Sequence, residues 1–191
     1  MGTTDKPIAL VVGAGDHLGA AIARRFAREG FHLVVTRRRG DLEKLCVEIS
    51  DLGSTATAIH SDARDETQVT ELINRVESEL GPIRVAIFNV GGNVRFDLCE
   101  TTTRVYQKVW EMCALAGFLV GREVAAKMLT RNEGTILFTG ASASLRGGAG
   151  FSAFAGGKHA LRALAQSMAR ELGPKGIHVG HVIVDGLIRN E

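Results

Sequence analysis

Apolar residues follow two alternating patterns along this chain. Short runs that are apolar almost throughout are separated by longer stretches in which apolar residues recur every three or four positions. The short runs show little alternation between apolar and polar residues, which is typical of strands in a parallel sheet whose two faces are covered by helices. Six such runs predict β-strands: residues 7–13, 31–36, 55–62, 85–91, 134–140 and 177–186.

The longer stretches predict helices with one apolar stripe each. Leu18, Ile22 and Phe26, for example, recur at spacings of four residues, which places them on one helix face. The predicted helices cover residues 18–30, 41–52, 66–80, 101–129 and 152–173. Strands that alternate with helices through right-handed crossovers predict an α/β fold, a doubly wound parallel sheet in a Rossmann-type three-layer sandwich.

Composition narrows the class of protein. A length of 191 residues predicts one domain over residues 1–191. A net charge of +2 is too small to indicate a nucleic-acid partner. No apolar run reaches membrane-spanning length, and no secretory leader is apparent. The three cysteines are odd in number and lack metal-ligand spacing, which predicts reduced thiols, no metal site and a cytoplasmic location.

The segment GAGDHLG follows the first predicted strand and leads directly into the first predicted helix. It contains Gly13, Gly15, His17, Leu18 and Gly19. Glycines let the backbone turn sharply and approach a pyrophosphate, and the free N–H groups at a helix N-terminus attract its negative charge. The segment therefore predicts a dinucleotide-binding loop, with a purely structural turn as the alternative.

With this glycine-rich segment between strand and helix, the chain resembles the short-chain dehydrogenase/reductase family. The resemblance extends over all 191 residues. The family's TGxxxGxG pattern maps onto Val12, Gly13, His17 and Gly19, so His17 stands where the family has its middle glycine. An imidazole there would either crowd the pyrophosphate or contact it.

The resemblance also assigns residues to the adenosine end of a cofactor. It implies that Asp62 contacts the adenine, although Asp62 could instead cap the following helix. Asn89 and Gly91 in FNVGG match the NNAG motif below the adenosine. Arg37 closes the second strand, where a carboxylate would bind the ribose hydroxyls of NAD. Guanidinium groups bind phosphate, so NADP(H) is favoured over NAD(H), although Asp16 stands where many NADP-binding relatives carry a basic residue.

The family's catalytic pattern is only partly present. A relative would use a tyrosine as proton donor, a lysine four residues later, a serine and an asparagine. Lys158 matches the lysine, whereas Phe154 stands in the tyrosine place and has no proton to give. The serine place falls on Ala141, which leaves Ser142 as the best remaining polar group. The asparagine place falls on Ala114.

The last residues correspond to the family's nicotinamide-binding segment. Gly186 matches the PG motif, and Ile188 stands where the backbone would hold the carboxamide. Relatives continue beyond this point, so the chain is expected to lack their C-terminal cap and last strand.

These assignments imply an NAD(P)-dependent oxidoreductase that transfers hydride between NADP and a carbonyl or alcohol, with altered catalysis. The alternative is a non-catalytic NADP-binding sensor or partner subunit. Helices 101–129 and 152–173 carry apolar residues beyond one stripe, including Phe118, Val120 and Val124. Relatives pair these helices across a two-fold axis, so a homodimer or homotetramer is expected.

Overall fold

A six-stranded sheet forms the centre of the computed structural model, which describes residues 5–186. The strands are β1 (Ile8–Val12), β2 (His32–Arg37), β3 (Ala56–His60), β4 (Ile83–Phe88), β5 (Gly134–Ala141) and β6 (Ile177–Val184). They lie in the order β3-β2-β1-β4-β5-β6, and every neighbouring pair is parallel. The chain adds β2 and β3 on one side of β1, and then β4, β5 and β6 on the other side. The strand order therefore reverses between β1 and β4.

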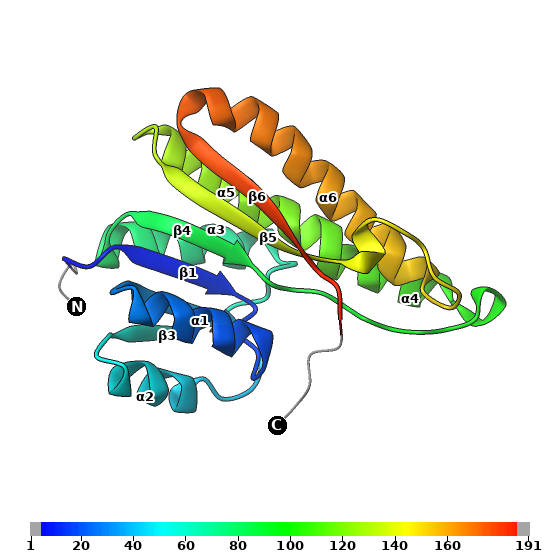
Figure 1. The fold of residues 1–191 in the computed structure, drawn as a ribbon, viewed down its shortest axis with the longest axis horizontal. Helices are drawn as coiled ribbons and strands as arrows, with labels where there is room; N and C mark the ends of the chain where they lie inside the picture. Colours follow the sequence, from blue (N-terminus) through cyan, green and yellow to red (C-terminus); the bar gives the residue numbers. More distant parts are fainter. Residues whose placement is uncertain (1–4, 187–191) are drawn as a thin grey trace.

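Helices cover both faces of this sheet (Figure 1). The α-helices are α1 (Leu18–Arg28), α2 (Glu43–Asp51), α3 (Glu66–Arg75), α4 (Thr103–Trp110), α5 (Ala116–Leu129) and α6 (Ser152–Leu172). Two segments are π-helical turns. The turn η1 (Val76–Leu80) extends α3, and the turn η3 (Glu111–Leu115) joins α4 to α5. The short 3-10 turns are η2 (Leu98–Glu100), η4 (Ser142–Ser144) and η5 (Gly173–Lys175).

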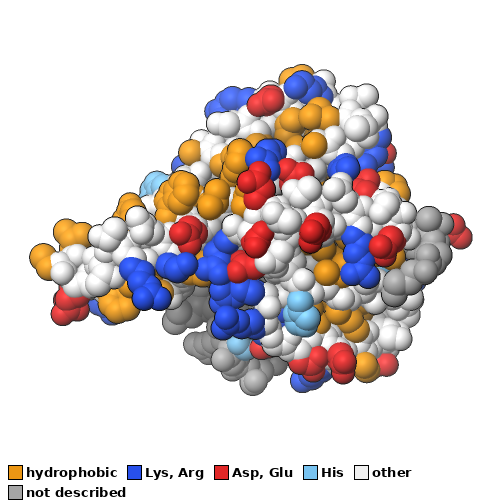
Figure 2. Space-filling view, turned by 180° about the vertical axis from the view of Figure 1, so that it is seen from behind, with side chains coloured by type: hydrophobic (Ala, Val, Ile, Leu, Met, Phe, Trp, Pro, Cys, Tyr) orange, Lys and Arg blue, Asp and Glu red, His pale blue; other side chains and the backbone are white. Residues whose placement is uncertain are grey.

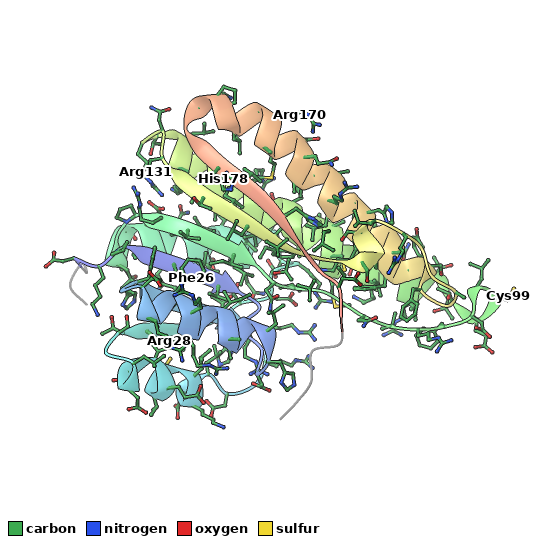
Figure 3. The ribbon with its side chains drawn as sticks, viewed as in Figure 1. Phe26, Arg28, Cys99, Arg131, Arg170 and His178 are labelled. Atoms are coloured by element: carbon green, nitrogen blue, oxygen red, sulfur yellow. The ribbon has the colours of Figure 1, made fainter. Side chains whose placement is uncertain are left out.

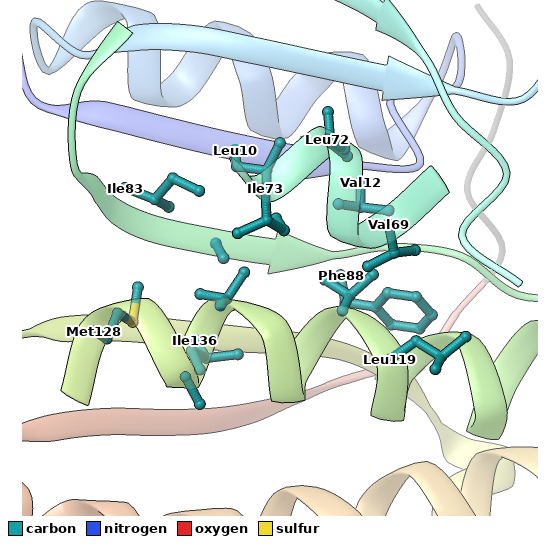
Figure 4. Packing of buried hydrophobic residues seen from close by; sticks show 14 of the residues in the cluster. Leu10, Val12, Val69, Leu72, Ile73, Ile83, Phe88, Leu119, Met128 and Ile136 are labelled. Carbon is teal, nitrogen blue, oxygen red and sulfur yellow. The ribbon is translucent and has the colours of Figure 1, made fainter. Parts of the chain in front are cut away.

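The core consists of two main apolar clusters, one on each face of the sheet. Leu10 and Val12 of β1 pack toward α3 and α5, whereas Ala9 and Val11 pack toward α1 and α2. All five residues of β1 are buried, as the absence of polar alternation predicts. Figure 4 shows the first cluster around Phe88 and Ile136. The predicted doubly wound, three-layer α/β sandwich is confirmed.

The helix predicted over residues 101–129 differs from the observed one in two respects. It is interrupted by the π turn η3, and its apolar residues are distributed differently from the expectation. Val120 and Val124 are almost fully buried in the core, so they do not extend an outer apolar face, whereas Phe118 is 41% exposed. The reason is that α5 packs against the sheet and also against α3 and α6, which buries more of its circumference than one stripe.

The three cysteines are free thiols in separate parts of the fold. Cys46 is half-buried on α2, Cys113 is buried in η3, and Cys99 is exposed. Figure 3 places Cys99 at the outer end of the segment that joins β4 to α4, away from the sheet. Within residues 5–186, no helix combines the length and apolar character needed to cross a membrane.

Candidate functional site

A cleft of about 680 Å³ opens at the carboxyl ends of β1, β4 and β5. A smaller hollow of about 250 Å³ lies at the carboxyl ends of β2 and β3. The cleft and the hollow share a lining that consists of Gly13, Gly15, Asn89, Val90 and Gly91. They therefore adjoin at the point where the strand order reverses, which is where doubly wound sheets bind their ligands.

The predicted dinucleotide-binding loop lies between the cleft and the hollow. Gly13 has a φ of +93°, and a Cβ there would lie 2.8 Å from the Asn89 carbonyl oxygen. A Cβ on Gly19 would collide with the Gly13 carbonyl oxygen. Glycine is therefore required at both positions by close backbone packing. A Cβ on Gly15 would meet no atom within 4 Å, so this residue leaves room on the ligand side.

The N-terminus of α1 faces the cleft. His17 is its N-cap residue and makes no side-chain cap hydrogen bond. Its side chain is exposed and contributes to the cleft lining together with Leu18 and Gly19. The first N–H groups of a helix have no intrahelical acceptor and carry the positive end of the helix dipole. The arrangement can therefore bind an anion, with the imidazole beside it.

The three arginines that line the hollow pair with two carboxylates. Arg37 Nη1 lies 2.7 Å from Asp16 Oδ1. Arg64 binds Asp62 through two contacts of 2.9 and 2.6 Å, while Arg38 lies 3.8 Å from the same carboxylate. The side-chain hydrogen bond from Arg64 lowers the pKa of Asp62 to about 2. Arg37 and Asp62, which the sequence assigned to one end of a cofactor, both line this hollow.

Asp62 does not cap the following helix. The N-cap residue of α3 is Asp65, whose carboxylate accepts a hydrogen bond of 3.1 Å from the Gln68 N–H. Asp62 instead holds the loop between β3 and α3 by accepting a hydrogen bond from the Arg64 N–H. The capping alternative for Asp62 was therefore wrong.

Two buried hydroxyl groups of the hollow have no partner among the described residues. These are Thr36 Oγ1, at the end of β2, and Ser61 Oγ, just after β3. Thr36 is 0% exposed and Ser61 is 8% exposed. Buried hydroxyls are nearly always hydrogen-bonded, so this pair is suited to a polar ligand. The sequence reasoning missed both residues, because a Ser or Thr at a strand end is common and carries no motif.

Asn89 and Gly91 join the two halves of the site. Asn89 Nδ2 donates to the Gly13 carbonyl oxygen at 3.0 Å, which ties the end of β4 to the dinucleotide-binding loop. A Cβ on Gly91 would lie only 3.2 Å from Lys158 Nζ. Asn89 thus positions the loop, and Gly91 leaves space for the lysine.

Lys158 and Phe154 lie one turn apart on α6, and both contribute to the cleft lining. Lys158 Nζ donates to the carbonyl oxygens of Thr139 at 2.8 Å and Val90 at 3.4 Å. Its nitrogen lies 5.9 Å from the centroid of the Phe154 ring. Burial lowers the pKa of Lys158. An ammonium has three donors, so one remains beyond these two carbonyls.

The surroundings of Phe154 are apolar. Phe154 is 9% exposed and belongs to a buried cluster with Val109, Cys113 and Ala153. Ala141, in the serine place, packs against this cluster. Ser142 lines the cleft, whereas Ser144 is fully buried and its hydroxyl accepts a hydrogen bond from the Ala141 N–H. Among these serines, Ser142 is the one that can reach a ligand in the cleft.

The sequence reasoning did not associate Cys113 with the site. The residue precedes Ala114 in the π turn, and a Cβ on Gly157 would lie 2.9 Å from its Cβ. Burial raises the pKa of Cys113, although the charge of Lys158 acts in the opposite direction. The thiol therefore stays neutral beside the ammonium. In the sequence, what could have linked Cys113 to the site was its position next to Ala114, which stands in the asparagine place.

Gly186 and Ile188 were predicted to bind the nicotinamide end of the cofactor. Gly186 lines the cleft, and Ile188 lies outside the described residues. Asn93 and Arg146 also line the cleft, and the sequence reasoning had singled out neither. His159 is exposed, with Nδ1 2.8 Å from the Ala155 carbonyl oxygen.

Comparison with known families matches residues 7–188 to the short chain dehydrogenases. The chain therefore belongs to the short-chain dehydrogenase family, as its motifs indicated. The first four curated relatives are 27–32% identical to it, and the matched region spans 64–74% of their length. The chain thus covers about two thirds of these relatives.

Solved structures of this family have the same fold. A short-chain dehydrogenase from Rhodopseudomonas palustris is 53% identical, with a TM-score of 0.89 over 93% of this chain and 84% of that one. An NAD⁺-bound xylitol dehydrogenase is 26% identical, with a TM-score of 0.90 over 94% and 70% of the two chains. A variant of the actinorhodin polyketide ketoreductase with NADPH is 27% identical, with a TM-score of 0.90 over 96% and 71%.

The Asp62 ion pair predicts a pH-dependent contribution to stability. Because its pKa is lowered from 3.8 to about 2 in the folded chain, its charged form stabilises the fold above about pH 4, and this contribution is lost as the pH falls through about 2. We expect Asp62→Asn to lower the free energy of unfolding by about 2 kcal/mol at pH 7. The difference from the unaltered protein should be constant down to about pH 4 and narrow below that.

Urea denaturation at a series of pH values measures this difference. Asp51→Asn makes the same change at an exposed position of α2, and it should alter stability by no more than about 0.5 kcal/mol. A loss at Asp62 as small as that of the control would contradict the assigned role of the ion pair.

Proposed function

We propose that the protein binds NADP(H) across the cleft and the hollow and acts as an oxidoreductase on a carbonyl or alcohol, with turnover limited by the lack of a proton donor at Phe154. The observation that carries the binding proposal is the anion-binding loop placed between a hollow with three arginines and a cleft with a buried lysine. Relatives of the same fold bind NAD⁺ or NADPH, which supports a nicotinamide cofactor.

Each part of such a cofactor has a matching group in this chain. The N–H groups at the start of α1 suit the pyrophosphate. Thr36 and Ser61 offer unpartnered hydroxyls to the adenosine half. The third donor of Lys158 suits a hydroxyl of the nicotinamide ribose. When bound, the dinucleotide supplies or accepts the hydride; the residues of the chain bind it and orient it.

The preference for NADP(H) over NAD(H) rests on Arg37. Its guanidinium lies at the end of β2, where a carboxylate would accept hydrogen bonds from ribose hydroxyls and repel a 2′-phosphate. Arg38 and Arg64 line the same hollow, and guanidinium groups pair well with phosphate. The cationic lining therefore favours the phosphorylated cofactor.

We expect Arg37→Asp to reverse the order of affinities, because it replaces a phosphate-binding cation with a group that repels phosphate and binds hydroxyls. Isothermal titration of NADPH and NADH measures both constants. The unaltered protein should bind NADPH more tightly, and the variant NADH. Tighter binding of NADH by the unaltered protein would refute the assignment of NADP(H).

The reactive end of the cleft supports slow rather than efficient chemistry. A general acid contributes roughly 10²- to 10⁴-fold to such reactions, and the Phe154 ring cannot donate a proton. Ala141 cannot polarise a carbonyl either, which leaves Ser142, the next residue along the chain and part of the cleft lining, as the candidate hydroxyl.

A second candidate function is binding of NADP(H) without turnover, as a sensor or a partner subunit. One observation favours it. The places where the resemblance implies a catalytic tyrosine and serine hold Phe154 and Ala141, which belong to or pack against an apolar cluster with Val109, Cys113 and Ala153. Consumption of NADPH in the presence of carbonyl compounds separates this function from the first.

Phe154→Tyr should raise NADPH-dependent carbonyl reduction by at least about tenfold, because it places a hydroxyl one helical turn from Lys158, whose charge lowers the pKa of a tyrosine. Adding Ala141→Ser should raise it further, since both groups act on the same oxygen. The assay is NADPH absorbance against a panel of ketones and aldehydes.

Lys158→Met in the Phe154→Tyr background is the matched control, and it should abolish most of the gain. If neither variant gains activity while NADPH still binds, the proposed catalytic position is wrong. If the unaltered protein is already fast, another group donates the proton, and Ser142 is the first to test.

We also propose that the protein is a cytoplasmic homodimer or homotetramer. Tyr106, Trp110 and Phe118, in the segment from α4 to α5, are 45%, 42% and 41% exposed. Large apolar residues exposed close together mark association surfaces. The three free thiols support the cytoplasm as the compartment. Light scattering at micromolar concentration should give at least twice the chain mass of 20.4 kDa; a monomer would refute the assembly.

A further inference from the structure

The ion pair between Asp16 and Arg37 connects the dinucleotide-binding loop to the end of β2. Arg37 Nη1 is 2.7 Å from Asp16 Oδ1 and also donates to the Asp41 carbonyl oxygen at 3.3 Å. A Cβ on Gly40 would lie 2.7 Å from Arg37 Nη2. The guanidinium is therefore folded over the turn at Gly40 and directed at the carboxylate.

The other arginines of the hollow also face a carboxylate. Arg64 makes two hydrogen bonds to Asp62, and Arg38 lies 3.8 Å from it. Figure 2 shows one face of the molecule, on which a group of Lys and Arg side chains lies beside several acidic ones. A phosphate that enters the hollow must therefore compete with carboxylates for the arginines.

The two carboxylates differ in how firmly they are held. Asp62 accepts three hydrogen bonds from Arg64 and its side chain is 21% exposed. The Asp16 side chain is 75% exposed, and it accepts one hydrogen bond from Arg37, whose side chain is 22% exposed. An ion pair with one highly exposed member contributes little to stability. Asp16 can therefore be removed at small cost to the fold, while its charge lies next to the cation on which the phosphate depends.

We propose that Asp16 is a specificity-determining residue, which weakens the binding of 2′-phosphorylated dinucleotides by occupying Arg37. The inference rests on the proposed function. A 2′-phosphate has to displace or share the Nη1 contact of Arg37, and its negative charge is repelled by the carboxylate. The ribose hydroxyls of NADH carry no charge, so Asp16 affects them far less. The chain thus carries a phosphate-binding arginine together with an internal competitor for it.

Asp16→Asn tests the proposal, because asparagine retains the shape of the side chain and removes its charge. We expect the Kd of NADPH to fall about tenfold at low ionic strength and the Kd of NADH to change less than about twofold. Calorimetric titration of each cofactor against each variant gives both values. The gain for NADPH should shrink as salt is added.

Asp41→Asn is the matched control. It removes one negative charge four residues beyond Arg37. The Asp41 carboxylate, however, accepts from the Glu43 N–H at 2.7 Å, and the hydrogen bond from Arg37 to Asp41 goes to the backbone carbonyl oxygen. This variant should leave the ratio of the NADPH and NADH constants unchanged. If Asp41→Asn improved NADPH binding as much as Asp16→Asn does, the effect would come from net charge alone, and the proposal would be overturned.

A double variant tests whether Asp16 acts through Arg37. In an Arg37→Ala background, Asp16→Asn should improve NADPH binding by no more than about threefold, the part that comes from direct repulsion of the phosphate. An undiminished tenfold gain, or an equal gain for NADPH and NADH, would overturn the proposed competition. Each comparison is made between variants with the same cofactor. It therefore tests the role of Asp16 even if the unaltered protein prefers NADH, a result that would refute only the assignment of NADP(H).

Discussion

The close packing of the dinucleotide-binding loop against the end of β4 is the constraint on which the site depends. Gly13 approaches the Asn89 backbone so closely that a side chain cannot be placed there, and Gly19 approaches Gly13 in the same way. The Asn89 side chain then holds the loop through the Gly13 carbonyl oxygen. These contacts fix the start of α1 at the reversal of strand order, so its N–H groups face the space that the cleft and the hollow share.

The two ends of the site differ in how their polar groups are satisfied. In the hollow, arginines and carboxylates pair with each other, while the hydroxyls of Thr36 and Ser61 have no partner within residues 5–186. At the reactive end, Lys158 is satisfied by two backbone carbonyls and its neighbours are apolar. The first end is suited to exchanging its internal partners for a charged ligand. The second end offers one donor of Lys158 to a ligand, but it holds no side chain at position 154 that can move a proton.

The sequence predicted the features that depend on local order along the chain. The alternation of apolar runs and amphipathic stretches identified the fold, because β1 is buried on both faces. The loop at Gly13 and the spacing of Phe154 and Lys158 were also readable, since each lies within a few residues. The burial of Val120 and Val124 could not be predicted from the sequence, because it depends on the packing of α3 and α6 against α5. The unpartnered state of Thr36 and Ser61, like the position of Cys113 against Gly157, likewise depends on tertiary neighbours that no local pattern contains.

A crystal structure of the protein with NADPH is the most direct test of this account. The pyrophosphate should lie at the start of α1, and the 2′-phosphate should contact Arg37. The nicotinamide should lie beside the Phe154 ring, with the Lys158 ammonium at the hydroxyls of the nicotinamide ribose. A dinucleotide bound elsewhere, or one whose adenosine ribose lies away from the hollow of Thr36 and Ser61, would contradict it.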